Sequence, residues 1–289
     1  MDKMQDKGIE IRKMCFEDIP FGFQLSLNEN WNQTQNDWDF MVGRKENLCL
    51  VAICKCKIVA TITVFNYNNQ IAWIGMVLVD REFRGMGIST MLLNQAINLL
   101  QNGQHIKLDA TSAGYPIYKK LKFKDEYQIF RMTFSPEANT QLKEDTSVRL
   151  MKNYHFQDVV EFDCIAFGTT REVLLKELIK NSPELAWVST NDEIISGCVF
   201  GRKGAKYTQI GPLSARNCTV AKKLISRIIE NNDHRSWVVD IPAYQSDFIK
   251  WMESLGFTTQ REFMRMYLGE NVSPINIKNQ FLISGPEFG

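Results

Sequence analysis

The chain repeats one pattern in its two halves, and this repeat limits its fold more than any other feature. Short segments of the first half recur in the second half in the same order. They are residues 9–14 and 148–153, 57–65 and 193–201, 73–78 and 209–213, 121–123 and 255–257, and 130–132 and 264–266. Because this period is far longer than that of a solenoid repeat, it indicates a duplicated domain. We expect domains over residues 1–135 and 147–289, joined by the polar, proline-containing linker 135–147.

Both halves alternate strand and helix patterns in the same order. In the first half we expect strands over residues 8–14, 48–55, 57–67, 70–80, 106–110 and 127–134, and helices over 16–28, 37–45, 90–101 and 115–121. In the second half we expect strands near 148, 185, 194 and 207 and over 237–241 and 262–268, and helices over 156–167, 171–180, 217–231 and 244–255. The turns at 55–57 and 66–69 predict hairpins. The pattern indicates an α/β (α+β) fold.

Two chain segments carry less regular patterns. Asn102-Gly103 is expected to stop the helix before it, because glycine and asparagine favour helix ends. The tail from Asn271 onward has apolar residues at Ile275 and in 281–283, which argues against full disorder. We expect this tail to fold back as an edge strand.

Composition excludes several classes of function. The 289 residues carry a net charge of +1 with a pI near 7.5, so no basic field favours nucleic-acid binding. The seven cysteines, an odd number mostly within apolar runs, indicate reduced thiols, and their spacing predicts no metal site. No apolar run reaches the length of a membrane span, and the charged start is no signal peptide. We therefore expect a cytoplasmic protein with no nucleic-acid or membrane partner.

Residues 77–93, VLVDREFRGMGISTMLL, combine a β-branched run, a glycine-rich turn and a helix start. Glycines in the turn allow unusual backbone angles and let a ligand approach the main chain closely. The first N–H groups of the helix have no internal partners and favour an anion, to which Arg84 adds positive charge. The segment therefore predicts a cradle for a phosphate group.

This turn and a later tyrosine resemble the signatures of the GNAT superfamily of acyl-CoA-dependent N-acyltransferases. Arg84 and Gly87 match the first two fixed positions of Gln/Arg-x-x-Gly-x-Gly/Ala, and Ser89 stands where glycine or alanine is usual. Tyr118 and the following Leu121-Lys122-Phe123 resemble the later signature, with Lys122 in place of glycine. The segments 31–34, 73–77 and 108–114 and the final residues 285–289 resemble a bacterial tandem-GNAT family, whose second domain is an uncharacterised GNAT-like module.

The resemblance implies two tandem GNAT-like domains, each a mixed, mostly antiparallel sheet flanked by helices. It implies that the fourth and fifth strands of the first domain splay apart to admit acetyl-CoA as co-substrate. The turn amides would then hold the pyrophosphate, and the strand before the turn would pair with the pantetheine arm. The donor-binding residues so implied are Met76, Val77, Leu78, Val79, Arg84, Gly85, Met86, Gly87, Ile88, Ser89, Thr90 and Thr111.

For catalysis the resemblance implies that Tyr118 protonates the leaving thiolate as general acid. Asp37 is the candidate general base, with Asp109 and Glu126 as alternatives, because the superfamily has no fixed base position. Residues Trp31, Asn32 and Gln33 are candidates for binding the acceptor. Structural roles compete with these assignments: Tyr118 as a core aromatic, Asp37 as a helix cap, and Trp31 and Trp38 as packing residues.

The second half lacks the chemistry of the first. Its turn, Pro212 to Cys218, contains no glycine, and the repeat sets Met252, which cannot donate a proton, opposite Tyr118. We therefore expect a degenerate domain that binds no acetyl-CoA productively and instead walls the acceptor site or mediates dimerisation. The predicted activity is N-acetylation of a small amine or a protein lysine by a monomer or homodimer. The alternative is a non-catalytic CoA-binding or interaction module.

Overall fold

The computed structural model describes residues 8–100, 103–134, 147–232, 236–271 and 274–289. The chain forms two compact units, which divide between Leu108 and Asp109. The domain boundaries predicted from the repeat stay a prediction, because all but the last residue of the expected linker 135–147 lies outside the described residues, as does Asn102 of the expected helix stop.

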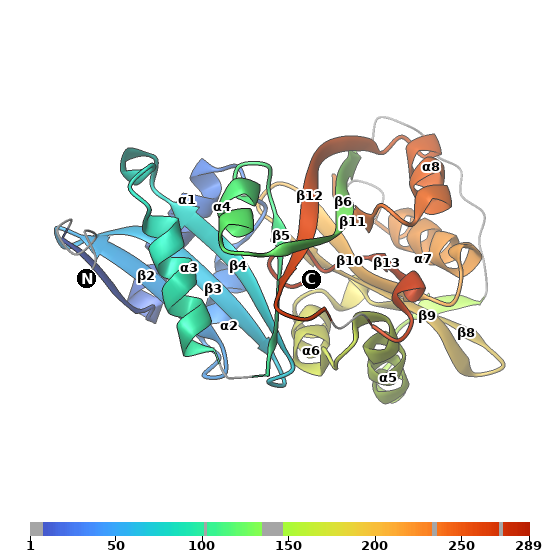
Figure 1. The fold of residues 1–289 in the computed structure, drawn as a ribbon. Helices are drawn as coiled ribbons and strands as arrows, with labels where there is room; N and C mark the ends of the chain where they lie inside the picture. Colours follow the sequence, from blue (N-terminus) through green and yellow to red (C-terminus); the bar gives the residue numbers. More distant parts are fainter. Residues whose placement is uncertain (1–7, 101–102, 135–146, 233–235, 272–273) are drawn as a thin grey trace. The chain divides into compact units, whose positions relative to one another are not determined.

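The first unit is built on the sheet order β1-β2-β3-β4-β5. Its strands are β1 (Ile9–Lys13), β2 (Leu48–Cys54), β3 (Lys57–Tyr67), β4 (Ile71–Val79) and the beginning of β5 (His105–Ala110), and its helices are α1 (Ile19–Asn28), α2 (Gln35–Val42) and α3 (Ile88–Leu99). All neighbours pair antiparallel except β4 and β5, which are parallel. Successive residues of β3 and β4 are buried, because α3 covers one face of the sheet and α1 and α2 cover the other (Figure 1).

Strand β4 changes its pairing midway along its length. Residues 71–74 pair with 105–108 of β5, and the pairing recorded between these two strands ends there. On the other side the register to β3 shifts after Gly75, and Met76 adopts φ 50°, where Thr61 donates a 2.9 Å hydrogen bond to its carbonyl. This is a β-bulge, a common way to redirect a strand near a functional site. The expected splay of the fourth and fifth strands begins here.

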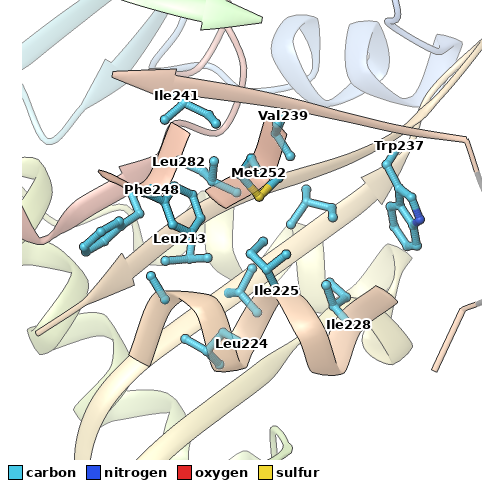
Figure 2. Close-up of a cluster of buried hydrophobic side chains, with 14 of the residues drawn as sticks. Leu213, Leu224, Ile225, Ile228, Trp237, Val239, Ile241, Phe248, Met252 and Leu282 are labelled. Carbon is cyan, nitrogen blue, oxygen red and sulfur yellow. The ribbon is translucent and has the colours of Figure 1, made fainter. Parts of the chain in front are cut away.

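The second unit has the sheet order β12-β6-β11-β10-β9-β8-β7, with β13 beside β10. Its strands are β6 (Lys124–Phe134), β7 (Val148–Leu150), β8 (Trp187–Asn191), β9 (Ile194–Lys203), β10 (Thr208–Ala215), β11 (Trp237–Pro242), β12 (Thr258–Leu268) and β13 (Gln280–Leu282). Its helices are α4 (Tyr115–Lys120), α5 (Phe156–Phe167), α6 (Glu172–Asn181), α7 (Cys218–Glu230) and α8 (Ser246–Ser254). Apolar residues of α7, α8, β10, β11 and β13 meet in one buried cluster (Figure 2).

Strand β6 closes the first repeat in the sequence, yet it pairs with two strands of the second repeat. It lies between β11 and β12 and is antiparallel to both. Its whole length is used, since residues 129–134 pair with β11 and residues 124–133 pair with β12. The compact units therefore divide at a different place from the repeats.

The predicted mixed, mostly antiparallel α/β architecture is confirmed, although several elements differ locally from their expected bounds. The segment 16–28 starts as a 3-10 helix, Phe16–Asp18, before α1, whose second residue is proline. Leu185 ends a 3-10 turn that Pro183 begins, so β8 starts only at Trp187. The tail does fold back as a strand, but not at an outer edge: β13 lies beside β10, where Phe281 and Leu282 are buried.

Candidate functional site

The turn after β4 has the backbone shape of an anion cradle. Gly85 and Gly87 take left-handed φ values of 78° and 81°, and a Cβ at either position would meet nothing within 4 Å. Gly87 is also the N-cap of α3, and no side chain of the described residues caps this helix. The N-terminus of a twelve-residue helix therefore faces open space without a capping side chain, an arrangement that favours an anionic group.

Arg84 anchors this turn. Its Nε donates to the carbonyl oxygen of Val79 at 3.1 Å, and its guanidinium lies 2.7 Å from the Glu29 carboxylate. Arg81 pairs with the same carboxylate at 3.0 Å. Partial burial works against ionisation of Glu29, but the hydrogen bonds from Arg81 and Arg84 hold its pKa below its ordinary value. The side chain of Arg84 therefore ties the turn to β4 and α1, and the backbone supplies the groups for an anion.

A cavity of about 330 Å³ lies in the first unit at the end of β4. Its lining comes from the end of α1, the start of β3, the end of β4 and the 3-10 turn that follows β4, and consists of Leu25, Asn28, Glu29, Lys57, Leu78, Val79, Asp80, Arg81 and Glu82. Its volume lies in the range of small-molecule sites. The cavity therefore borders two of the predicted donor-binding residues, Leu78 and Val79.

The predicted acceptor-binding residues lie between α1 and α2. Asn32 and Gln33 are each only 4% exposed, and Trp31 is half-buried, with its backbone N–H bonded to Ser26. Within the described chain the buried Oε1 of Gln33 has no hydrogen-bond partner. A buried acceptor atom without a partner costs free energy, which an N–H donor from a ligand would recover.

Trp38 and Asp37 have structural roles. Trp38 is fully buried against Gly22 and donates from Nε1 to Ser26, so it packs α2 on α1. The Asp37 carboxylate accepts from the backbone N–H and the hydroxyl of Thr34 at 2.6 and 2.8 Å and completes the capping box of α2. The cap competes with the predicted role of Asp37 as a base, which stays a prediction.

Tyr118 lies on α4 and is 8% exposed. Its ring packs against Gly114, where a Cβ would come within 2.8 Å of it, and edge-on against Phe123 at 5.8 Å between centroids. Burial raises the pKa of Tyr118, so the phenol keeps its proton at neutral pH. No hydrogen bond of this hydroxyl is recorded within the described residues, which suits a group that donates to a ligand.

Thr111 caps the start of α4. Its hydroxyl accepts from the Gly114 backbone N–H at 3.2 Å, and its carbonyl oxygen accepts from the N–H groups of Gly114 and Tyr115. These hydrogen bonds fix the start of α4, the helix that carries Tyr118. A donor contact to Thr111 stays a prediction.

Asp109, an alternative base, belongs to a buried ion pair. Its carboxylate accepts two hydrogen bonds from Arg265, at 2.8 and 2.9 Å, and Arg265 also donates to Tyr127 at 2.6 Å. Burial raises the pKa of Asp109, against the charge and the hydrogen bonds of Arg265. Both carboxylate oxygens are nevertheless occupied by Arg265, which leaves little capacity to take a proton from an amine. The other alternative, Glu126, is half-buried on β6.

The same ion pair occurs a second time in the second unit. Arg131 of β6 donates two 2.7 Å hydrogen bonds to Asp240 of β11. The two arginines occupy equivalent positions of the repeat, 130–132 and 264–266, and each pairs with an aspartate on a strand of the other repeat. Sequence reasoning missed these pairs, although two arginines in apolar strand patterns were a signal of buried charge.

The second-half counterpart of the turn is closed by its own side chains. Asn217 is the N-cap of α7 and accepts from the backbone N–H of Val220 at 3.0 Å, so this helix supplies its own cap. Met252, the counterpart of Tyr118, is fully buried in the apolar cluster together with Leu282 of the tail (Figure 2). Neither an open helix N-terminus nor a proton donor exists at these positions.

Comparison with known proteins agrees with the repeat. Residues 10–123 match the family described as Acetyltransferase (GNAT) family, and residues 159–282 match the one described as Acetyltransferase (GNAT) domain. Each half of the chain thus matches the same kind of domain separately. Within the described residues no helix is long and apolar enough to cross a membrane.

Individual relatives are similar over most of the chain. An uncharacterized N-acetyltransferase, YitH, of Bacillus subtilis (strain 168) is 25% identical over 69% of this chain and 70% of its own length. The holothin acyltransferase of Pseudoalteromonas sp. (strain SANK 73390) is 24% identical over 86% of this chain and 83% of its own length. The crystal structure of a putative acetyltransferase from Pyrococcus horikoshii has the same fold, with a TM-score of 0.82 at 23% identity, covering 98% of this chain and 96% of that one.

Proposed function

As a member of the GNAT superfamily with two GNAT domains in tandem, this chain is an acyl-CoA-dependent acyltransferase, and we propose that its first half transfers the acetyl group of acetyl-CoA to a primary amine. The observation that carries the donor assignment is the uncapped start of α3 behind two left-handed glycines with open space over both. A diphosphate is the anion that the superfamily places there, and backbone N–H groups bind it without needing side-chain charge.

The pantetheine arm would run along β4. Residues 75–79 continue β4 beyond the four residues that pair with β5, so this stretch is the proposed edge for the arm, although the carbonyl oxygens of Met76 and Val79 already accept from Thr61 and Arg84. The arm carries amide groups and can pair with Met76, Val77, Leu78 and Val79 as an added strand would. Such recognition reads the main chain, which agrees with the apolar side chains at these positions.

The proposed reaction is direct transfer. The neutral amine attacks the thioester carbonyl carbon, and the tetrahedral intermediate then collapses with cleavage of the carbon–sulfur bond. The Tyr118 phenol donates its proton to the departing thiolate, and the amine nitrogen loses a proton to a base or to water. The products are the N-acetylated amine and CoA, and Tyr118 regains a proton from solvent. Burial raises the pKa of Tyr118, so the phenol is present in the protonated form that a donor needs, although the same burial makes it a weaker acid.

The acceptor is proposed as a small-molecule amine or a protein lysine. The near-neutral charge of the chain favours neither class. Gln33 supports an acceptor site close to α2, since its buried Oε1 lacks a partner within the described chain and would accept from an N–H donor. Asp37 is the proposed base, and an Asp37→Asn variant tests it: a kcat lowered about 100-fold or more with unchanged CoA affinity supports it, and an unchanged kcat excludes it. We place the enzyme in the cytoplasm as a monomer or homodimer.

The test of this function is release of free thiol from acetyl-CoA in the presence of a panel of amines. The proposal expects thiol release that depends on the amine, with N-acetylated product detected by mass spectrometry. Binding of CoA without amine-dependent turnover across amino acids, polyamines and lysine peptides would favour a non-catalytic CoA-binding module. Failure to bind CoA would exclude both.

A further inference from the structure

The tail of the chain occupies the gap between two parallel strands of the second unit. Strands β10 and β11 pair over residues 208–210 and 237–239 and then separate. From that point β13 pairs antiparallel with β10, Leu282 opposite Leu213 and Gln280 opposite Ser214. On the other side the N–H of Ile283 donates to the carbonyl oxygen of Asp240 on β11 at 3.1 Å. The tail thus bonds to both strands where they diverge.

In the sequence repeat, this gap corresponds to the gap between β4 and β5. The parallel pairing of β10 and β11 ends at Ile210, and that of β4 and β5 ends at Ile74, which the repeat aligns with it. Both strands then change register to their antiparallel neighbour, at Gly75 in β4 and after Ile210 in β10. The two gaps therefore arise from the same local geometry, and in the second one the strand β13 pairs with β10 where β10 and β11 separate.

The walls of the second gap fit the tail closely. A Cβ on Gly211 would lie 2.0 Å from the carbonyl oxygen of Ile283, so only glycine allows the tail to pass there. Phe281, Leu282 and Ile283 are at most 3% exposed. Leu282 lies among Val239, Met252 and other side chains of the apolar cluster (Figure 2). The gap is therefore a packed part of the core.

Buried charges hold the end of the tail. Glu287 pairs with Arg202, and both are almost fully buried. Arg171 donates to the carbonyl oxygen of Gly289 at 2.8 Å while it forms a bidentate pair with Asp163. Ser214 of β10 donates to the same Asp163 carboxylate at 2.8 Å. Removal of the tail would leave Arg202 without this buried partner, a costly state, so these residues favour permanent occupancy.

We propose that residues 280–289 are a built-in occupant of the second gap, a chain segment that takes the place of a pantetheine arm and excludes acyl-CoA from the second domain. The protein then has a single donor site. This inference rests on the proposed function in one respect, because it assumes that the corresponding gap in the first half is the acyl-CoA site.

Hydrogen exchange of the full chain without ligand tests the occupancy. Amides in residues 281–283 should exchange as slowly as those of β10, since they are hydrogen-bonded and buried. Exchange at the rate of an unstructured peptide would overturn the proposal. In a Gly211→Ala variant these amides should exchange at least about tenfold faster, because the new methyl group displaces the tail. The control is Gly269→Ala, which also replaces a left-handed glycine of this unit but has nothing within 4 Å of the new Cβ. Equal exchange of the tail in both variants would overturn the close fit at Gly211.

Isothermal titration with CoA tests the exclusion. The unmodified chain should bind one equivalent, and a Gly87→Glu variant should bind CoA at least about 100-fold more weakly. Two equivalents in the unmodified chain would overturn the proposal, as would one equivalent in Gly87→Glu accompanied by protection of residues 211–218. If the unmodified chain binds no CoA, the proposed function fails instead, and exchange of the tail amides alone still decides whether the tail is the permanent occupant.

Discussion

The two inter-strand gaps of this molecule come from the same sequence pattern and have different contents. In the first half the gap is followed by two left-handed glycines and an uncapped helix. In the second half β13 lies in the gap, and Asn217 caps the helix that follows. Under the proposed function, one backbone design serves a binding site in the first half and a packed core in the second. The two halves differ in whether a strand of the chain lies in the gap and whether a side chain caps the helix that follows.

Other paired features of the two halves are alike, which makes the differences informative. Each half contributes one buried arginine to an aspartate of the other repeat, Arg131 to Asp240 and Arg265 to Asp109. These pairs have nearly equal distances and burial. The two halves therefore share these buried ion pairs, whereas the two left-handed turn glycines and the glycine N-cap occur at the helix start of the first half.

The largest expected effect concerns these buried pairs. Arg131→Met and Arg265→Met should each lower the free energy of unfolding by about 3–5 kcal/mol, because each leaves a buried carboxylate without its partner. Urea denaturation of both variants measures this, with Lys180→Met as a control for the loss of an exposed cation. A decrease in the free energy of unfolding well under 1 kcal/mol in either variant would show that the two ion pairs do not stabilise the fold equally.

The next effect concerns the two helix starts. Gly87→Glu should weaken CoA binding at least about 100-fold, because a carboxylate in the cradle repels the diphosphate. Asn217→Gly, at the matching helix start, should leave CoA affinity unchanged and cost only a few tenths of a kcal/mol of stability. Titration calorimetry of both variants compares the two starts, and a loss of affinity in Asn217→Gly instead would reverse the assignment.

A comparable effect is expected on the rate of transfer when Tyr118, the counterpart of Met252 in the repeat, is replaced. Tyr118→Phe should lower kcat about 100-fold while the affinity for CoA stays the same, since only the proton donor is removed. Tyr115→Phe is the control on the same helix, because the Tyr115 hydroxyl donates to the exposed Asp125 and should not affect turnover. Equal rates for Tyr118→Phe and the unmodified enzyme would remove the general-acid role.

The smallest effect concerns the side chain that caps the 3-10 helix before α1 in the first half and before α5 in the second half. The backbone N–H of Cys15 donates to Asp18, and the backbone N–H of Lys152 donates to Nδ1 of His155. Hydrogen bonds from Arg12 and from the Cys15 backbone lower the pKa of Asp18 from 3.8 to about 2. Its contribution to stability is therefore present above about pH 4 and is lost as the pH falls through about 2.

The cap in the second half should respond in a different range of pH. Burial, and to a lesser extent Arg149, lowers the pKa of His155 below 6.5, so the folded state favours the neutral ring that accepts the hydrogen bond. Its contribution is present above pH 6.5 and falls as acidification protonates the ring, by at most about 1 kcal/mol, the value of one hydrogen bond. Thermal unfolding between about pH 7.5 and 5.5 measures this. A His155→Asn variant should lose that dependence, and an unchanged dependence would assign it to another group.

Local features of the fold were predictable from the sequence. The repeat, the strand and helix order and the glycine-rich turn all depend on neighbouring residues, and α3 begins at Ile88, two residues from the expected start. The competing reading of Asp37 as a cap was also local, since Thr34 three residues earlier completes a capping box. Such features are encoded by spacing within a few residues.

Features that depend on distant partners were not predictable. The strand β6 pairs with β11 and β12 rather than within its own repeat, which no local pattern indicates. The tail was expected at an outer edge because its apolar residues indicate burial but do not indicate the strand with which they pair. Likewise, Arg84 reads as a free positive charge in the sequence, but Glu29, far away in the chain, holds it.

The most direct test of the account is a crystal structure of the full chain with acetyl-CoA. The account predicts density for the diphosphate on the backbone amides of residues 85–89 and for the pantetheine arm along residues 76–79, with residues 280–289 still between β10 and β11. Density for the cofactor between β10 and β11, with the tail displaced, would contradict it.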